Sequence, residues 1–153
     1  MQVPDDAQVI SATFNGQLAV GAGMIFICVL IHGIGLFKLR QAIVGKEGDR
    51  HGDWRPLSMT GALLTVATVF AILLLHFVEI WLFAFLYDVL NALPDFQEAL
   101  YFSTISYATI GYSDASIATE WRMLAAVEGV LGVIMLGWST AFFVRILGTL
   151  EGD

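Results

Sequence analysis

Four ionisable residues lie inside long apolar segments, a setting in which side chains that bind cations or carry protons are costly to place. They are His32, His76, Glu79 and Glu128. Ionisable groups in a bilayer usually face the interior of a helix bundle. The 88–121 connection joins the end of the second segment to the start of the third. At the rise of an α-helix, Glu79 lies about 12 Å from that end of its segment, and Glu128 lies about 9 Å from that start of its own. We therefore expect the two carboxyl groups at similar depth.

The two histidines are candidates for binding one metal centre, and their depths decide against it. His32 lies about 8 Å before the end of its segment, whereas His76 lies about 25 Å after the start of its own, both measured from the 38–58 loop. Two axial ligands of one haem iron must lie at the same depth, so the spacing argues against a membrane redox subunit. We predict that both are interior histidines without a cofactor.

Three apolar segments must position these residues. They run from Leu18 to Phe37, from Met59 to Tyr87 and from Met123 to Val144. Each reaches or exceeds the roughly 18–20 residues that cross a bilayer, and backbone groups in lipid must satisfy their own hydrogen bonds. Of the 153 residues, 58% are hydrophobic and only 14% are charged. The sequence therefore predicts an all-α membrane protein with three transmembrane helices.

The basic residues predict the orientation of these helices. Five of the seven basic residues lie between the first two segments: Lys38, Arg40, Lys46, Arg50 and Arg55. The formal net charge of the whole chain is −7. The positive-inside rule places this loop in the cytoplasm. The N-terminus and the 88–121 connection are then outside, and the C-terminus is cytoplasmic. An acidic chain of this kind lacks the basic face that nucleic acid requires.

The external connection contains a second, shorter helical pattern. Asp95 followed by Glu98, with Pro94 just before, fits the start of a helix. The residues from Phe96 to Ala108 would then form a helix of about 20 Å, too short to span a bilayer but suited to re-enter one inside a protein. Its C-terminal end, which carries partial negative charge, would point inward and favour a cation.

The residues that follow this helix carry a family resemblance. The stretch from Tyr101 to Asp114 reads YFSTISYATIGYSD. It resembles the pore loop of potassium channels, whose signature is Thr-Val-Gly-Tyr-Gly-Asp. Residues 109–114 match five of the six positions when Ile110 is counted as a conservative replacement of valine. The resemblance covers roughly residues 60–147.

The resemblance implies a potassium-selective filter and a role for each matching residue. Rings of backbone carbonyls replace the hydration shell of K⁺ in such filters. The carbonyls of Thr109, Ile110, Gly111 and Tyr112, with the Thr109 hydroxyl, would bind the ion, and Asp114 would anchor the outer end. One chain supplies a quarter of each ring, so a homotetramer conducting monovalent cations passively is expected.

Ser113 is the position at which the sequence departs from the family. The family has glycine there, and serine in a left-handed conformation costs about 1–2 kcal/mol. The resemblance still places Ser113 among the ion-binding residues, but we hypothesise that the serine weakens potassium selectivity. The alternatives to a potassium channel are a weakly selective cation channel and a non-conducting, pore-like membrane scaffold.

Residues behind the filter are expected to support it. We predict that Glu128 hydrogen-bonds there to Ser106, Tyr107 or the filter backbone. Gly132 and Gly137 in the third segment either allow close helix packing or form a hinge for gating.

The sequence thus divides into two parts. Residues 1–58 would form an external tail, the first transmembrane helix and the basic loop. Residues 59–150 would form the pore module: outer helix 59–87, pore helix 95–108, filter 109–114 and inner helix 121–147. We expect a multi-pass protein of the cell membrane that contacts lipid, has no catalytic residues and uses no cofactor besides the permeant K⁺.

Overall fold

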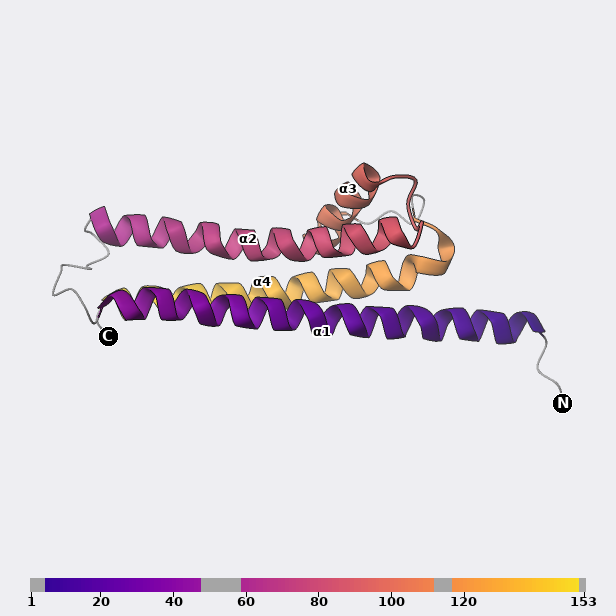
Figure 1. The fold of residues 1–153 in the computed structure, drawn as a ribbon, viewed down its shortest axis with the longest axis horizontal. Helices are drawn as coiled ribbons and strands as arrows, with labels where there is room; N and C mark the ends of the chain where they lie inside the picture. The colour runs from indigo at the N-terminus through magenta and orange to yellow at the C-terminus, as the bar shows by residue number, and fades with distance from the viewer. Residues whose placement is uncertain (1–4, 48–58, 112–116, 152–153) are drawn as a thin grey trace. The chain divides into compact units, whose positions relative to one another are not determined.

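The computed structural model describes residues 5–47, 59–111 and 117–151, and every element in these ranges is a helix (Figure 1). The order is α1 (Asp5–Glu47), α2 (Met59–Val89), α3 (Phe96–Tyr107), the 3₁₀-helix η1 (Thr119–Trp121) and α4 (Arg122–Glu151). The predicted all-α class is confirmed.

Three of the helices are long and apolar enough to cross a membrane. The candidate spans are Phe14–Ile43, Met59–Val89 and Thr119–Gly148, with mean hydropathies of 2.3, 2.4 and 1.9. No more than 33% of any of these apolar stretches is buried within the chain. The remaining apolar surface is available to lipid, as expected of a multi-pass membrane protein.

The first helix is longer than the sequence indicates. It begins at Asp5 instead of near Leu18, so the predicted N-terminal tail is largely helical, and it continues ten residues past Phe37 to Glu47. Hydropathy marks the part of a helix that lipid can cover, not the ends of the helix itself. No proline interrupts residues 5–47, and nothing else in that stretch forces the helix to stop.

The chain forms two compact units that cut across the long helices. Unit 1 comprises Met1–Cys28 and Glu79–Ile134, and unit 2 comprises Val29–Val78 and Met135–Asp153. The predicted division after residue 58 falls outside the described residues, and α2 begins at Met59, where the predicted outer helix begins.

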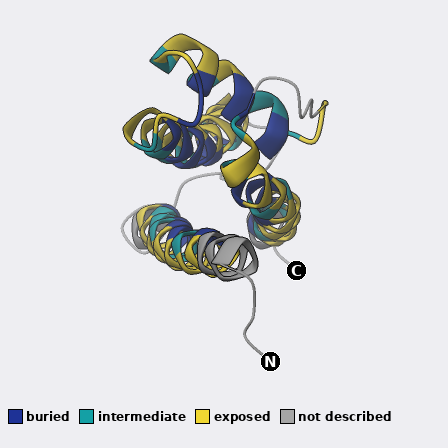
Figure 2. Cartoon of the chain, turned by 90° about the vertical axis from the view of Figure 1, so that its right-hand side faces the viewer, coloured by how far each residue is buried: buried dark blue, intermediate teal, exposed yellow. Residues whose placement is uncertain are grey.

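In unit 1, α3 lies alongside the C-terminal part of α2 (Figure 1). Its buried residues recur every three or four positions and cover one side of the helix (Figure 2): Ala99, Phe102, Ser103, Ser106 and Tyr107. The ring of Phe102 meets that of Tyr87 edge-on at 5.6 Å. This spacing is that of an amphipathic helix, so α3 is held by a single packed face.

The start of α4 is fixed by a side chain of α1 in the same unit. Gln17 is buried, and its Oε1 accepts a hydrogen bond of 3.0 Å from the Met123 amide. The first amides of a helix have no partner within the helix, so this bond satisfies one of them.

In unit 2, segments of α1, α2 and α4 share an apolar core. Ile43 and Ile146 are buried there, and Leu39, Leu64 and Phe142 pack against them.

The predicted separation of the two histidines is wrong, and unit 2 shows why. The ring centroids of His32 and His76 are only 5.2 Å apart. Measured from Glu47, the true end of α1, His32 lies about 22 Å into its helix, and His76 lies about 25 Å from the start of α2. The error came from taking Phe37 as the end of the first helix.

Candidate functional site

The candidate site begins where α2 ends, in a hydrogen-bonded turn. The Ala92 amide donates to the Tyr87 carbonyl at 2.9 Å, and the Asn91 amide donates to the Asp88 carbonyl at 3.0 Å. This pair of bonds is the Schellman motif, in which one residue takes a left-handed conformation. That residue is Asn91, with φ of 50°. Further along, the Ala118 amide donates to the Ala92 carbonyl at 3.0 Å, so the connection returns to the point at which it leaves α2.

The start of α3 confirms the predicted N-cap. Asp95 has extended backbone angles, and its Oδ1 accepts a hydrogen bond of 2.9 Å from the Glu98 amide. Such a cap satisfies one of the unpaired amides of the first turn. The helix begins at Phe96 and ends at Tyr107, one residue inside each end of the predicted range 95–108.

The end of α3 repeats the motif that ends α2. The Ile110 amide donates to the Ile105 carbonyl at 3.0 Å, and the Thr109 amide donates to the Ser106 carbonyl at 3.1 Å. Thr109 is the left-handed residue, with φ of 56°. A β-branched residue in this region is a real outlier, because its side chain crowds the backbone. Strain of this kind persists only where the surroundings impose it, and it is concentrated at functional sites.

The strip that follows is not covered by the rest of its own chain. Thr109, Ile110 and Gly111 are exposed, and Ile110 is 76% exposed although its side chain is apolar. The change from a right-handed Ala108, with φ of −78°, to the left-handed Thr109 turns the backbone out of the helix and into this strip. Tyr112, Ser113 and Asp114 lie outside the described residues, and their predicted roles stay predictions.

Glu128 of α4 is buried behind α3, but its partners are not those that the sequence suggested. Its carboxylate accepts a hydrogen bond of 2.7 Å from the Tyr87 hydroxyl and another from the Ser103 hydroxyl. The prediction is therefore wrong for Ser106, Tyr107 and residues 109–111 of the filter, whereas residues 112–114 lie outside the described residues. The residue of α4 that meets the end of α3 is Gly132, one turn later, so Glu128 faces the preceding turn of α3.

Tyr107, predicted to support the filter, is tied to the other buried glutamate. Its hydroxyl donates to the Glu79 carboxylate, and both residues are buried. Burial, reinforced by this hydrogen bond, raises the pKa of the Tyr107 phenol above its usual range. The phenol therefore stays protonated and remains a donor. Each glutamate thus fixes one tyrosine, and Tyr107 lies two residues before the strained Thr109.

A comparison of the sequence with known families assigns the part of the chain that contains this site. The ion channel family model matches residues 71–149, which include the C-terminal part of α2, α3, the exposed strip and nearly all of α4. The chain belongs to the ion channel family. Searches of curated proteins and of solved structures found no match. The resemblance noted in the pore loop is confirmed at the level of this family, and the whole of α1 precedes the channel's matched region.

Gly132 and Gly137, the two candidate hinge residues of the channel, lie in different surroundings. A Cβ atom at Gly132 would overlap the carbonyl oxygen of Tyr107, whereas a Cβ at Gly137 would meet nothing within 4 Å. Gly132 therefore allows α4 to pack directly against the end of α3. A hinge at either glycine stays a prediction.

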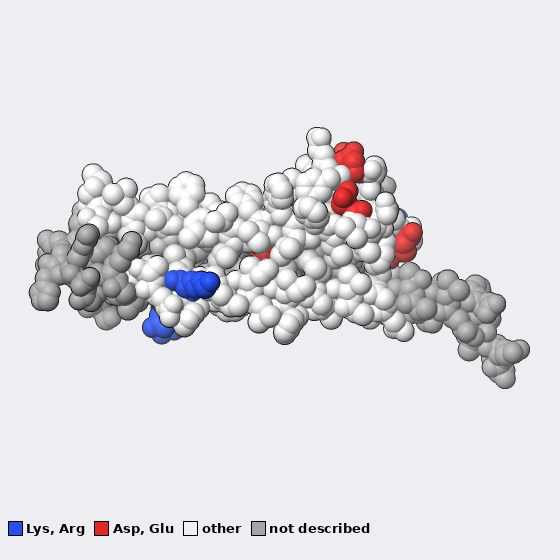
Figure 3. Space-filling model, in the orientation of Figure 1, with Lys and Arg blue, Asp and Glu red and all other residues white. Residues whose placement is uncertain are grey.

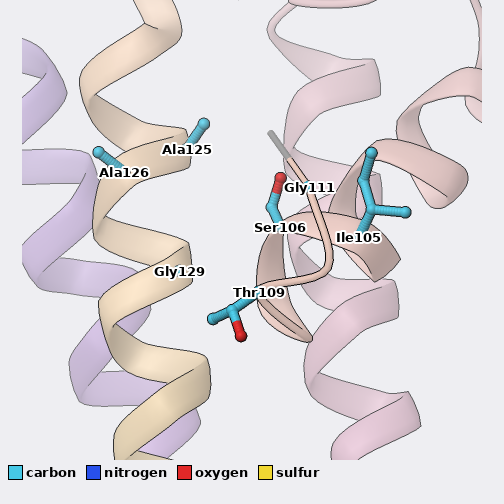
Figure 4. Close-up of a pocket in the computed structure, with 7 residues that line it drawn as sticks. All are labelled: Ile105, Ser106, Thr109, Gly111, Ala125, Ala126 and Gly129. Atoms are coloured by element: carbon cyan, nitrogen blue, oxygen red, sulfur yellow. The ribbon is translucent and has the colours of Figure 1, made fainter. Parts of the chain in front are cut away.

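A cavity of about 330 Å³ lies between the exposed strip and α4 (Figure 4). It is lined by residues of α3, of the strip and of α4, and those of α4 are all small: Ile105, Ser106, Thr109, Gly111, Ala125, Ala126 and Gly129. The buried Ser106 hydroxyl, predicted as a filter support, has no hydrogen-bond partner in the described part of the chain. The small side chains leave room beside the strip.

Sequence reasoning missed Ser103 and Tyr87 as parts of the site. The Ser103 hydroxyl also lies 2.9 Å from the Ile80 carbonyl, so it connects α3 to both α2 and α4. A signal was available, because Ser103 and Tyr107 are four residues apart and share one face of α3.

Proposed function

We propose that four copies of the channel assemble around a common axis and conduct K⁺ through a filter lined by the carbonyls of residues 109–112. The observation that carries the proposal is the left-handed Thr109, which ends α3 and leads into a strip that its own chain leaves exposed. One chain cannot surround an ion, and cyclic symmetry supplies the missing three quarters of each ring. Carbonyl oxygens then replace the water around K⁺.

The buried contacts behind α3 support this function by holding the strip in place. Tyr107 is bonded to Glu79, and Ser103 is bonded to Glu128. A filter selects ions only if its oxygens keep a suitable number and field strength around the ion. Anchoring α3 to α2 and α4 through buried polar groups restricts the movement of the strip at its helical end.

The surface charge of unit 1 fits an outer vestibule for cations. Four acidic residues in the described part of unit 1 are exposed: Asp88, Asp95, Glu98 and Glu120. Figure 3 colours Asp and Glu side chains red on one face of the molecule. An acidic surface raises the local cation concentration and the rate of entry. In this proposal the 88–121 connection faces outward in the cell membrane, and the N-terminus lies on the same side. The basic 38–58 loop and the C-terminus are cytoplasmic.

The filter test is a flux assay in liposomes that contain the purified channel. We expect K⁺ efflux that exceeds Na⁺ efflux and that external Ba²⁺ blocks. The Ile110→Val variant should retain flux, because it restores the family residue and changes only a side chain. Thr109→Ala should weaken the Ba²⁺ block, because it removes a hydroxyl that the proposal places on the ion. A channel that forms tetramers but passes no cation would favour the non-conducting scaffold.

Ser113 determines whether the channel is strictly selective. We propose that Ser113→Gly increases the preference for K⁺ over Na⁺, since glycine is the family residue at this position and adopts left-handed backbone angles at no steric cost. Reversal potentials measured with K⁺ on one side and Na⁺ on the other give the ratio directly. Strict selectivity in the wild type, unchanged in Ser113→Gly, would refute the weakened filter.

A further inference from the structure

Unit 2 contains a buried polar cluster to which three helices each contribute one side chain. His32 comes from α1, His76 from α2 and Ser139 from α4, and they are 0%, 7% and 5% exposed. The Ser139 Oγ lies 3.0 Å from His32 Nε2 and 3.1 Å from His76 Nε2. The same nitrogen of both rings is therefore directed at one point.

The geometry of the two rings is that of a pair of metal ligands. Their ligand atoms lie within 4.8 Å of one another, and the ring planes are inclined by 48°. The indole of Trp138 packs against His32 at a centroid distance of 5.4 Å and restricts its ring. A serine hydroxyl has a single proton, so it can donate to only one of the two nitrogens. The other nitrogen must then carry a proton of its own or lose that hydrogen bond.

A cavity of about 230 Å³ opens beside the cluster within unit 2, and His76 and Ser139 are among the residues that line it. Its other walls are mainly apolar: Val69, Ile72, Leu73, Leu136, Thr140 and Phe143. Because this cavity adjoins His76 and Ser139, a water molecule in it can bind to an ion held by the cluster.

We propose that His32, His76 and Ser139 form a binding site for Zn²⁺. Zinc accepts imidazole nitrogen at roughly 2.0–2.1 Å in tetrahedral sites. Both Nε2 atoms bind with the ring proton on Nδ1, the Ser139 oxygen supplies a third ligand, and a water from the cavity supplies the fourth. Neutral imidazoles bind without releasing a proton.

The residues favour a single borderline-soft ion over other occupants. Imidazole nitrogens suit zinc and its neighbours, whereas K⁺ takes oxygen ligands. A haem does not fit, because the Ser139 side chain occupies the space between the two nitrogens. A bound ion would tie α1 to α2 and α4. The test of this site measures zinc binding and does not depend on conduction.

The test measures zinc bound to the full-length channel in detergent under reducing conditions, by equilibrium dialysis and elemental analysis. The chain has three histidines, so His51→Gln is the matched control. We expect a single zinc ion per chain in the wild type and in His51→Gln. His32→Gln and His76→Gln should weaken binding at least about tenfold, the loss typical even of residues that only hydrogen-bond to a ligand.

A variant that should bind zinc more tightly tests the proposal even if a histidine variant fails to fold. Ser139→Cys should tighten zinc binding, because thiolate is a preferred zinc ligand, and should add a sulfur-to-metal absorption band when Co²⁺ replaces zinc. Ala141→Cys, two positions further along α4 and outside the lining of the cavity, should do neither. Absence of zinc binding in the wild type, loss of zinc in His51→Gln, or equal behaviour of the two cysteine variants would overturn the proposal.

Discussion

Two helices of unit 1 end in the same hydrogen-bond pattern but with different residues at its most demanding position. At the end of α2 the left-handed residue is Asn91, and at the end of α3 it is Thr109. Asparagine tolerates this conformation, whereas a β-branched residue is strained in it. The first turn only redirects the chain. The second leads into the strip proposed to bind ions, where the proposal places the threonine hydroxyl on the ion.

The surroundings of the two turns explain how the strain is maintained. Just before Thr109, the Tyr107 hydroxyl is bonded to Glu79, and α4 lies directly against the Tyr107 carbonyl at Gly132. A conformation that costs free energy persists where neighbouring groups over-determine it. Tertiary contacts therefore hold α3 at its C-terminal end, where the residue type of Thr109 disfavours the left-handed conformation that the turn requires.

Removing the close approach at Gly132 should have the largest effect. In Gly132→Ala the added methyl group would overlap the Tyr107 carbonyl oxygen, and overpacking of this kind costs about 3 kcal/mol. Gly137→Ala, with open space around it, should be neutral or stabilising by up to about 1 kcal/mol because alanine favours helix. Thermal unfolding followed by tryptophan fluorescence compares the two. Equal stability of both variants would contradict the packing of α4 against α3.

The two tyrosines test the same comparison at the level of hydrogen bonds. Tyr107→Phe removes the donor to Glu79, and Tyr87→Phe removes a donor to Glu128, each at a cost of about 1–3 kcal/mol. The stability losses should be similar. Only Tyr107→Phe should alter the ratio of K⁺ to Na⁺ permeability, because Tyr107 adjoins the strip. An identical permeability ratio in both variants would show that the contact with Glu79 does not position the filter.

Glycine substitutions at the two left-handed residues should have the smallest effect on stability. Thr109→Gly relieves about 1–2 kcal/mol of strain but loses about 0.5–1 kcal/mol to the greater freedom of the unfolded chain. A net gain of about 0.5–1 kcal/mol is expected, and Asn91→Gly should change stability by less. Thr109→Gly should nevertheless reduce K⁺ conduction. If it destabilised the fold, the left-handed Thr109 would not be strained.

Local signals in the sequence were sufficient for some of these features. The cap at Asp95 depends on residues three positions apart, and the length of α3 follows from its amphipathic spacing, so both could be predicted. The left-handed Thr109 could not be predicted from residue type, because threonine is disfavoured there. Tertiary contacts impose that conformation.

Errors arose where one helix had to be placed against another. The depth of His32 was measured from the end of the hydropathic segment instead of from Glu47, which shifted it by ten residues. The partners of Glu128 were wrong by one helical turn, because the contact between α4 and α3 depends on the close approach at Gly132. Hydropathy indicates which helices lie in the membrane but not their register.

The most direct test of ion binding by the strip is an electron cryomicroscopy map of the channel in lipid nanodiscs with K⁺. We predict a fourfold assembly in which the carbonyl oxygens of Thr109, Ile110 and Gly111 surround ion density on the symmetry axis. A map in which these residues face lipid, or lie away from any symmetry axis, would contradict the proposed filter.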